Sequence, residues 1–151
     1  MDWDHIATDI KLRPEACNLL VSPSINRLEK MTDEISKTNI SMINLGQKLS
    51  EILLNIAKKD QPRAINQWFD VGLNAFKPGP LVCTHIDMLF EPSFNLDPLN
   101  LFRRLSRTTQ LIVLWPGDFS NRNLSYAVPE HHHYRTWRVD DPQISIQRLL
   151  D

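Results

Sequence analysis

Glycine is scarce in this sequence, with 4 residues among 151, and cysteine is scarcer still, with 2. Loops that bind phosphate normally consume glycines, because their backbone N–H groups must wrap around the anion. The shortage of glycine therefore argues against an ordinary phosphate-binding loop. Cys17 and Cys83 both lie in apolar, strand-like runs, where a reduced and buried thiol is favoured over a disulfide or a metal ligand.

The sequence also lacks long apolar runs and a large net charge. No run approaches the ~20 apolar residues that a membrane span requires. The segment before Pro14 carries acids where a secretory leader would carry basic residues, so we expect a cytoplasmic protein without a membrane partner. A formal net charge of -1 gives no overall basic field, and DNA binding would have to rest on local patches.

What the sequence does contain is a composition typical of one globular domain. Hydrophobic residues make up 42% and charged residues 23%, and 151 residues are enough to bury a sizeable core without disulfides or a structural metal. We expect a single domain over residues 1–151. Weak helical spacing before Pro14 predicts a helix over residues 3–12, within an N-terminal extension formed by residues 1–15.

The stretch from Pro80 to Gly117 predicts the fold class. Two short apolar runs, Leu81–Cys83 and Leu111–Trp115, flank an amphipathic segment, Asp97–Arg107. Two strands joined by a crossover helix normally lie parallel in one sheet. Ligands of such sheets bind outside the carboxyl ends of the strands, so we expect the functional site there.

The rest of the chain continues this alternation of strands and helices. Further strands are predicted at residues 16–21 and 39–45, and apolar residues recurring every three or four positions predict helices at 25–35, 49–56 and 62–76. A polar loop at 118–123 then leads into a strand-rich end, with segments at 124–128, 136–139 and 144–150. The pattern predicts an α/β three-layer sandwich with a mainly parallel sheet.

The turn after the first predicted strand stands where a nucleotide-binding α/β domain carries its phosphate loop. An active loop, GxxxxGK[ST], supplies glycines for the backbone, a Lys for the phosphates and a hydroxyl for magnesium. The eight residues from Ser22 are SPSINRLE, so Leu28 and Glu29 replace the Lys and the hydroxyl residue, and Glu29 would repel a phosphate. An ordinary strand-to-helix turn is therefore favoured, although a bare helix N-terminus still attracts anions.

The end of the third predicted strand carries Thr84 and His85 where an acid would hold a nucleotide's magnesium, and Asp87 follows later. A metal or water site would combine Asp87 with His85 and Glu91. One His and two acids in a loop are a weak signal, and a polar network in the loop is favoured over a metal site.

Histidines and arginines are the remaining candidates for contact with a partner or a nucleic acid. His131, His132 and His133 are consecutive, and because neighbouring side chains diverge on a regular element, they cannot all share one ion. A solvated or partner-facing cluster is favoured. The arginine candidates are Arg103, Arg104 and Arg107 on the crossover helix and Arg135 after the histidines. A charged, solvated helix face is the default interpretation of the first three, and contact with a nucleic-acid backbone is the alternative.

Three stretches carry a resemblance to a known family. They are INLGQKLSEILL from Ile43, the run HIDMLFEPSFNLDPLNLFRRLSRTTQLIVLWPG that ends at Gly117, and LSYAVPEHHHYR from Leu124. Through them the chain resembles the BrxF family, small P-loop proteins of type 3 BREX phage-resistance systems. The resemblance implies a P-loop NTPase-like fold with a RecA- or AAA-like core, and it implies other subunits of a phage-defence system as partners.

Departures from the family's pattern shape the functional prediction. The family is expected to have an intact phosphate loop and an acid at the end of the third strand, the Walker A and Walker B motifs, and both are degenerate here. Ser22, Ser24 and Asp87 are then the residues of a vestigial nucleotide site, and Trp115-Pro116-Gly117 lies where a strand end would sense the nucleotide. No catalytic residue, metal or other cofactor is predicted, and ATP with magnesium is doubtful.

The prediction is a non-catalytic subunit or adaptor of a bacterial anti-phage defence system. Two alternatives stay open. One is an ATPase subunit whose site is completed by a partner, and the other is a DNA-binding module that uses the arginines. A homo-oligomer is compatible with each of them.

Overall fold

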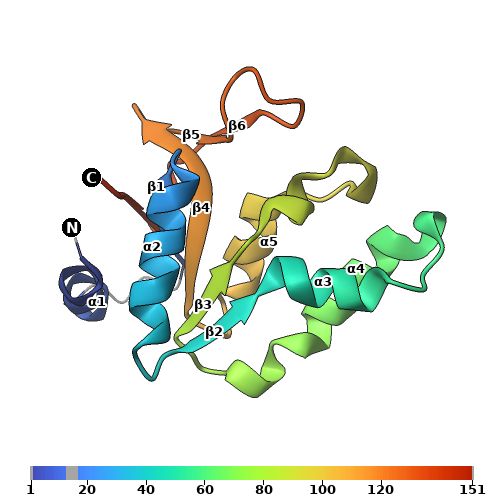
Figure 1. Ribbon diagram of the computed structural model, residues 1–151, viewed down its shortest axis with the longest axis horizontal. Coiled ribbons are helices and arrows are strands. Elements are labelled where there is room, and N and C mark those ends of the chain that lie inside the picture. The colour runs from blue at the N-terminus through green and yellow to red at the C-terminus, as the bar shows by residue number, and fades with distance from the viewer. Residues whose placement is uncertain (1, 13–16, 151) are drawn as a thin grey trace.

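Five strands form the parallel core of the fold. The computed structural model describes residues 2–12 and 17–150, and within them these strands follow the spatial order β2–β3–β4–β1–β7, with every neighbouring pair parallel (Figure 1). They are β1 (Cys17–Ser22), β2 (Ser41–Asn44), β3 (Leu81–Thr84), β4 (Leu111–Ser120) and β7 (Ile144–Arg148). All six residues of β1 are buried, as expected for a strand in the middle of a parallel sheet.

Two further strands pair in antiparallel fashion with the end of β4, and these three paired segments are called the hairpin below. The last four residues of β4, from Gly117 to Ser120, pair with β5 (Asn123–Tyr126), which pairs with β6 (Arg135–Arg138). Asn121 and Arg122 form the two-residue turn between β4 and β5. Their positive φ values of 50° and 63° suit a turn of type I′. In Figure 1 the hairpin and the loop after β5 stand beyond the carboxyl ends of the parallel strands.

Helices connect the parallel strands and begin at side-chain caps. Ser24, Asn44 and Asp97 each accept a hydrogen bond from the backbone N–H three residues later, which satisfies an otherwise unpaired donor of the first helical turn. In the described residues the helices are α1 (Trp3–Leu12), α2 (Ile25–Ser36), α3 (Leu45–Leu53), α4 (Gln61–Gly72) and α5 (Pro98–Leu105), with 3₁₀ turns η1 (Lys58–Asp60), η2 (Asn74–Phe76), η3 (Asp87–Phe90) and η4 (Pro92–Phe94). None of these helices is both long enough and apolar enough to cross a membrane.

The two faces of the sheet are covered by different helices. Leu20, Val82 and Ile112 pack in one core with Trp3 of α1 and Met31 of α2. The alternate strand residues, which point the other way, pack in a second core with residues of α3, α4 and α5; among them are Leu19, Cys83, Val113, Leu49, Phe69 and Phe102. Helices around a mostly parallel sheet confirm the predicted α/β class, and cores on both faces are consistent with a three-layer sandwich.

The structure also corrects several predicted boundaries. β4 continues through Gly117 to Ser120, so the predicted polar loop at 118–123 is in large part strand. Trp115-Pro116-Gly117 is therefore the middle of a strand and does not stand at a strand end. The helix predicted at 49–56 begins at Leu45 and ends at Leu53. The predicted helix at 3–12 is confirmed, whereas residues 1 and 13–15 of the predicted extension lie outside the described residues.

Both cysteines are buried and free, as predicted. Burial removes the thiolate from water and raises the pKa of Cys83 to about 12, and burial likewise raises the pKa of Cys17 to about 12. At neutral pH both groups are therefore thiols that pack as small apolar side chains.

The close approach of β4 and β5 predicts that Gly117→Ala destabilises the fold. A Cβ atom at this position would overlap the backbone oxygen of Ser125, so the strands would have to separate. We expect the free energy of unfolding to fall by roughly 1–3 kcal/mol or more, measured by urea denaturation. Ser120→Ala, at the exposed end of the same strand, is the control and should change it by less than about 0.5 kcal/mol. Equal midpoints for the two variants would contradict this account.

Candidate functional site

Ser22 and Ser24 lie at the carboxyl end of β1, where the sequence places a vestigial phosphate loop. The Ser22 hydroxyl accepts a hydrogen bond from the backbone N–H of Ser24 (3.0 Å), and the Ser24 hydroxyl accepts one from the N–H of Arg27 (3.1 Å). Both hydroxyls therefore cap the start of α2. Two backbone N–H groups that a phosphate loop would offer to an anion are already used by the chain itself.

The carboxylate of Glu29 links α2 to the end of β3. Its Oε1 lies 2.9 Å from Nε2 of His85, and Nδ1 of His85 lies 2.8 Å from the hydroxyl of Thr84. A carboxylate only accepts hydrogen bonds, so Nε2 of His85 must carry the proton. His85 has a positive φ of 55°, which lets the chain turn at the strand end and point its ring back at α2.

Asp87 belongs to a separate contact, with the hairpin. The phenol of Tyr126 donates a 2.8 Å hydrogen bond to Oδ1 of Asp87, and its ring stacks on Phe90 with the centroids 3.6 Å apart. Trp115 packs edge-on against Phe90 and donates its indole N–H to the backbone oxygen of Ser125 at 2.9 Å. Burial and the Asp87 carboxylate raise the pKa of Tyr126 above its ordinary value, so the phenol stays a donor.

The metal hypothesis for His85, Asp87 and Glu91 does not match this geometry. His85 faces Glu29 and Asp87 faces Tyr126, while Oε2 of Glu91 lies 3.7 Å from Nε2 of His133. Within residues 2–12 and 17–150 no group of three or more His, Cys, Asp or Glu side chains is arranged to hold a metal ion. Each of the three side chains thus contacts a different partner within the fold.

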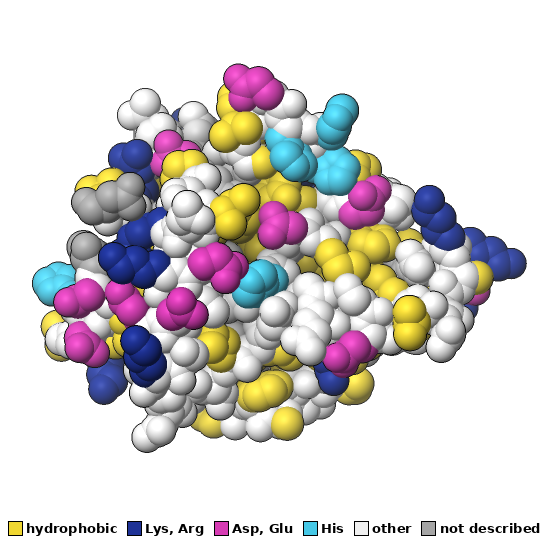
Figure 2. Space-filling model, viewed as in Figure 1, with side chains coloured by type: hydrophobic (Ala, Val, Ile, Leu, Met, Phe, Trp, Pro, Cys, Tyr) yellow, Lys and Arg dark blue, Asp and Glu magenta, His cyan; other side chains and the backbone are white. Residues whose placement is uncertain are grey.

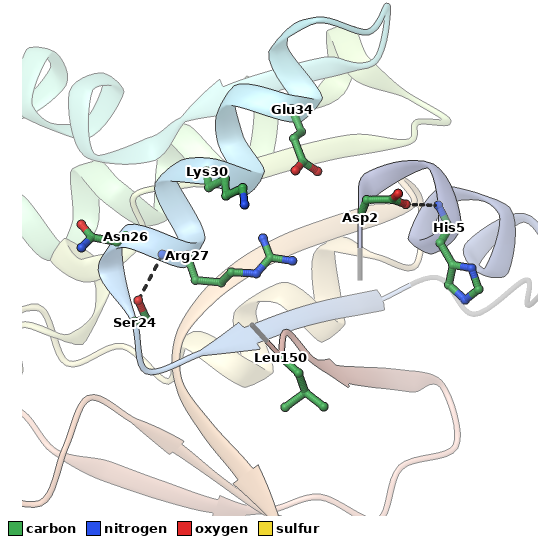
Figure 3. A pocket seen from close by; sticks show the side chains of 8 residues that line it. All are labelled: Asp2, His5, Ser24, Asn26, Arg27, Lys30, Glu34 and Leu150. Carbon is green, nitrogen blue, oxygen red and sulfur yellow. Dashed lines mark hydrogen bonds between the residues drawn. The ribbon is translucent and has the colours of Figure 1, made fainter.

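A cavity of about 950 Å³ lies beside α2 (Figure 3). Arg27 and Lys30 extend from α2 toward the start of α1. Glu34, which is also on α2, accepts a hydrogen bond there from the backbone N–H of Trp3 at 3.0 Å. Leu150 lies across the cavity from α2. The sequence gives no sign of this cavity, because its walls come from the start of the chain, α2 and the end of the chain.

Three of the four candidate contact arginines are held by neighbours within the fold. Arg103 and Arg104 each place a guanidinium nitrogen 3.4 Å from a carboxylate, that of Asp141 and that of Asp70 respectively. Arg135 donates to the backbone oxygen of Leu96 at 2.9 Å, and its guanidinium lies 4.8 Å from the centre of the Trp137 ring. Arg107 is exposed. A carboxylate thus balances the charge of Arg103 and that of Arg104, whereas Arg135 is held by uncharged groups.

The three histidines lie in the loop between β5 and β6. The rings of His131 and His133 approach to 5.5 Å between centroids, and the backbone N–H of His133 donates to Nδ1 of His131 at 3.0 Å. His132 is exposed. His131 and His133 line a cavity of about 460 Å³ together with Asp87, Met88, Glu91, Phe94 and Tyr126. The sequence marked the histidines and Asp87 as site candidates, whereas it favoured a core position for Tyr126, which brings the hairpin to the β3 end.

Comparison with known proteins adds no name to this description. No family model matches the chain, and no curated protein or solved structure does so either. The fold defines an α/β protein with a mostly parallel sheet, whose residues at the carboxyl edge are engaged in internal contacts.

The contact between Tyr126 and Asp87 yields a prediction for Tyr126→Phe. This change removes the hydroxyl and keeps the ring that stacks on Phe90. We expect a loss of about 1–3 kcal/mol in the free energy of unfolding, since the bond has a charged acceptor and a buried donor. Tyr134→Phe, on an exposed ring, is the matched control and should be nearly neutral. Equal losses in the two variants would show that the bond contributes nothing.

The ion pairs at the hairpin predict the titration of Asp140. A hydrogen bond from Arg122 holds the pKa of Asp140 below its ordinary value of 3.8. A carboxyl whose pKa is lowered on folding adds stability above its unfolded pKa, and this is lost as the pH falls through the folded pKa. Carboxyl NMR should show the lowered midpoint, and Arg122→Gln should raise it. A midpoint unchanged by Arg122→Gln would contradict the assignment.

Proposed function

We propose that this protein is a non-catalytic subunit or adaptor of a bacterial anti-phage defence system, built on a P-loop-type core whose nucleotide site has been lost. The defence assignment rests on the resemblance to the BrxF family in the stretches around β2–α3, β3–β4 and β5. The loss of nucleotide chemistry rests on the contacts at the carboxyl ends of β1 and β3.

The topology supports a P-loop-type core. β1 lies between β4 and β7, and the chain leaves it through α2 toward β2 on one side and reaches β7 on the other. Sheets of this kind bind ligands outside the carboxyl ends of strands where the order reverses. The turn from Ser22 to α2 therefore lies where a phosphate loop would have to be.

The contact between Glu29 and His85 carries the non-catalytic part of the proposal. Glu29 occupies the position of the hydroxyl residue that would hold magnesium, and its carboxylate is 2.9 Å from His85 at the β3 end. A phosphate placed there would meet a like charge without the compensating Lys, because Leu28 stands in its place. The hydroxyls of Ser22 and Ser24 cap α2 in addition.

Titration calorimetry with ATP and magnesium tests this part. We expect no binding in the micromolar range for the wild-type chain. Micromolar binding with turnover that Asp87→Ala abolishes would overturn the proposal. The double variant Leu28→Lys/Glu29→Thr restores the two side chains that a phosphate loop uses. Gain of ATP binding in that variant would support a P-loop-type core, and a folded variant that binds no better than wild type would count against it.

Co-purification tests the adaptor part. The tagged chain, expressed with the proteins encoded beside its gene, should form a stable complex with at least one of them. Adjacent methyltransferase, phosphatase-like and large ATPase genes would fit the proposed system. Free chain at every concentration tested, with all neighbours expressed and folded, would contradict an adaptor role.

A second candidate is a nucleotide-dependent subunit whose site is completed by a partner. The cavity of about 950 Å³ beside the start of α2, with Arg27 and Lys30 on its wall, favours it because this volume lies within the range of ligand sites. Mixing the chain with its neighbouring proteins should then raise ATP hydrolysis above the sum of the separate rates. Lys30→Ala should remove the gain, whereas Lys48→Ala on α3 should not.

A further inference from the structure

A second cavity, of about 460 Å³, opens between the hairpin and the β3–α5 connection. Asp87, Met88 and Glu91 form one side, and His131 and His133, from the loop after β5, form the other. Figure 2 shows histidine and acidic side chains gathered on this part of the surface, whereas Lys and Arg side chains lie toward its two sides. The cavity is distinct from the contacts between Glu29 and His85, and its size suits a side chain or a small ligand.

The floor of this cavity is aromatic and is held by contacts within the fold. Tyr126 is 3% exposed, stacks on Phe90 and is fixed by its hydrogen bond to Asp87. The ring of His131 stands edge-on to it, with 5.8 Å between the centroids, and Phe94 and Met88 add apolar surface. Because Tyr126 is almost fully covered, a flat or apolar ligand body would pack chiefly on His131 and Met88 above this floor.

Two carboxylates at the rim keep acceptor capacity. Tyr126 uses Oδ1 of Asp87, and the backbone N–H of Ser93 uses Oε1 of Glu91 at 3.4 Å. Among the described residues no group donates a hydrogen bond to Oδ2 of Asp87. Oε2 of Glu91 faces His133 at 3.7 Å, too far for a direct hydrogen bond. Each oxygen can accept donors from an incoming group.

No Lys or Arg side chain of the described residues lines this cavity. The backbone N–H of His133 donates to Nδ1 of His131, so the ring of His131 is held with Nδ1 as an acceptor and Nε2 as its hydrogen-bearing nitrogen. The acidic groups that line the cavity are the two carboxylates, of which Glu91 also faces His133. The cavity is therefore complementary to a cation.

We propose that this cavity binds the guanidinium of an arginine presented by a partner protein. A guanidinium is planar, stacks on aromatic and imidazole rings, and donates pairs of parallel hydrogen bonds to carboxylates. The cavity offers each of these counterparts: the aromatic floor, the two imidazoles and the acceptors of Asp87 and Glu91. The identity of the partner rests on the proposed adaptor function, whereas the guanidinium site itself is a property of this chain.

The test uses the full chain and a blocked arginine, N-acetyl-arginine amide, with backbone amides followed by NMR. Amides of Glu91, Tyr126 and His133 should shift together, with a dissociation constant on the order of 1 mM. The neutral isostere N-acetyl-citrulline amide should bind at least about fivefold more weakly, because it lacks the charge that pairs with the carboxylates. N-acetyl-lysine amide, whose ammonium cannot form the planar pairs, should also bind more weakly.

Matched variants separate this site from general attraction of cations to acidic surface. Glu91→Gln, which keeps the shape of the side chain, should weaken arginine binding by about fivefold. Glu51→Gln, an exposed acid on α3, should leave it unchanged. Asp87→Asn serves as a second site variant should Glu91→Gln alter the far-ultraviolet circular dichroism.

Three results would overturn the proposal. They are equal binding of arginine and citrulline, lysine binding as tightly as arginine, and equal effects of Glu91→Gln and Glu51→Gln. The isolated chain could bind arginine while no complex forms in the co-purification. That result would contradict the adaptor function but support the guanidinium site. A complex that forms normally with Glu91→Gln and Asp87→Asn would show that the partner does not place an arginine in this site.

Discussion

The close packing of β5 against the far end of β4 is the constraint on which the carboxyl edge depends. Gly117 has no Cβ, so the backbone oxygen of Ser125 can approach β4, and the indole of Trp115 donates to that same oxygen. This pairing carries Tyr126 over the β3–α5 connection, where its phenol reaches Asp87. The second cavity exists because these contacts hold the hairpin beside η3 and η4.

The sequence predicted the parallel part of the fold well because its signals are local. Buried strands read as short apolar runs, and α2 shows both its three- and four-residue spacing and its cap at Ser24. The extension of β4 was missed because Pro116 and Gly117 usually end a strand. Here Pro116 keeps its place in the register opposite Ser22 of β1, and Gly117 is required by β5 rather than by a turn.

The candidate site was predictable as a set of residues but not as a set of pairs. The sequence marks Glu29 as unsuited to phosphate and places His85 and Asp87 at the β3 end. It cannot show that Glu29 meets His85 across 56 positions, or that Asp87 meets Tyr126 across 39, because such pairings arise only when the sheet has formed. The metal hypothesis grouped His85, Asp87 and Glu91 because they are close in the sequence. In the fold each of them faces a partner on a different element.

The balance of charges distinguishes the surfaces that a partner could use. Arg103, Arg104, Arg122 and Arg148 each lie within 3.4 Å of a carboxylate of this chain, so a phosphate backbone would have to displace these pairs. The rim of the second cavity is different, since Asp87 and Glu91 face it without a Lys or Arg of the described residues. Exposed ion pairs contribute little to folding, whereas unbalanced charge beside a preformed apolar wall favours recognition of the opposite charge. The proposed guanidinium site therefore uses a different surface from the arginines on which a DNA-binding module would depend.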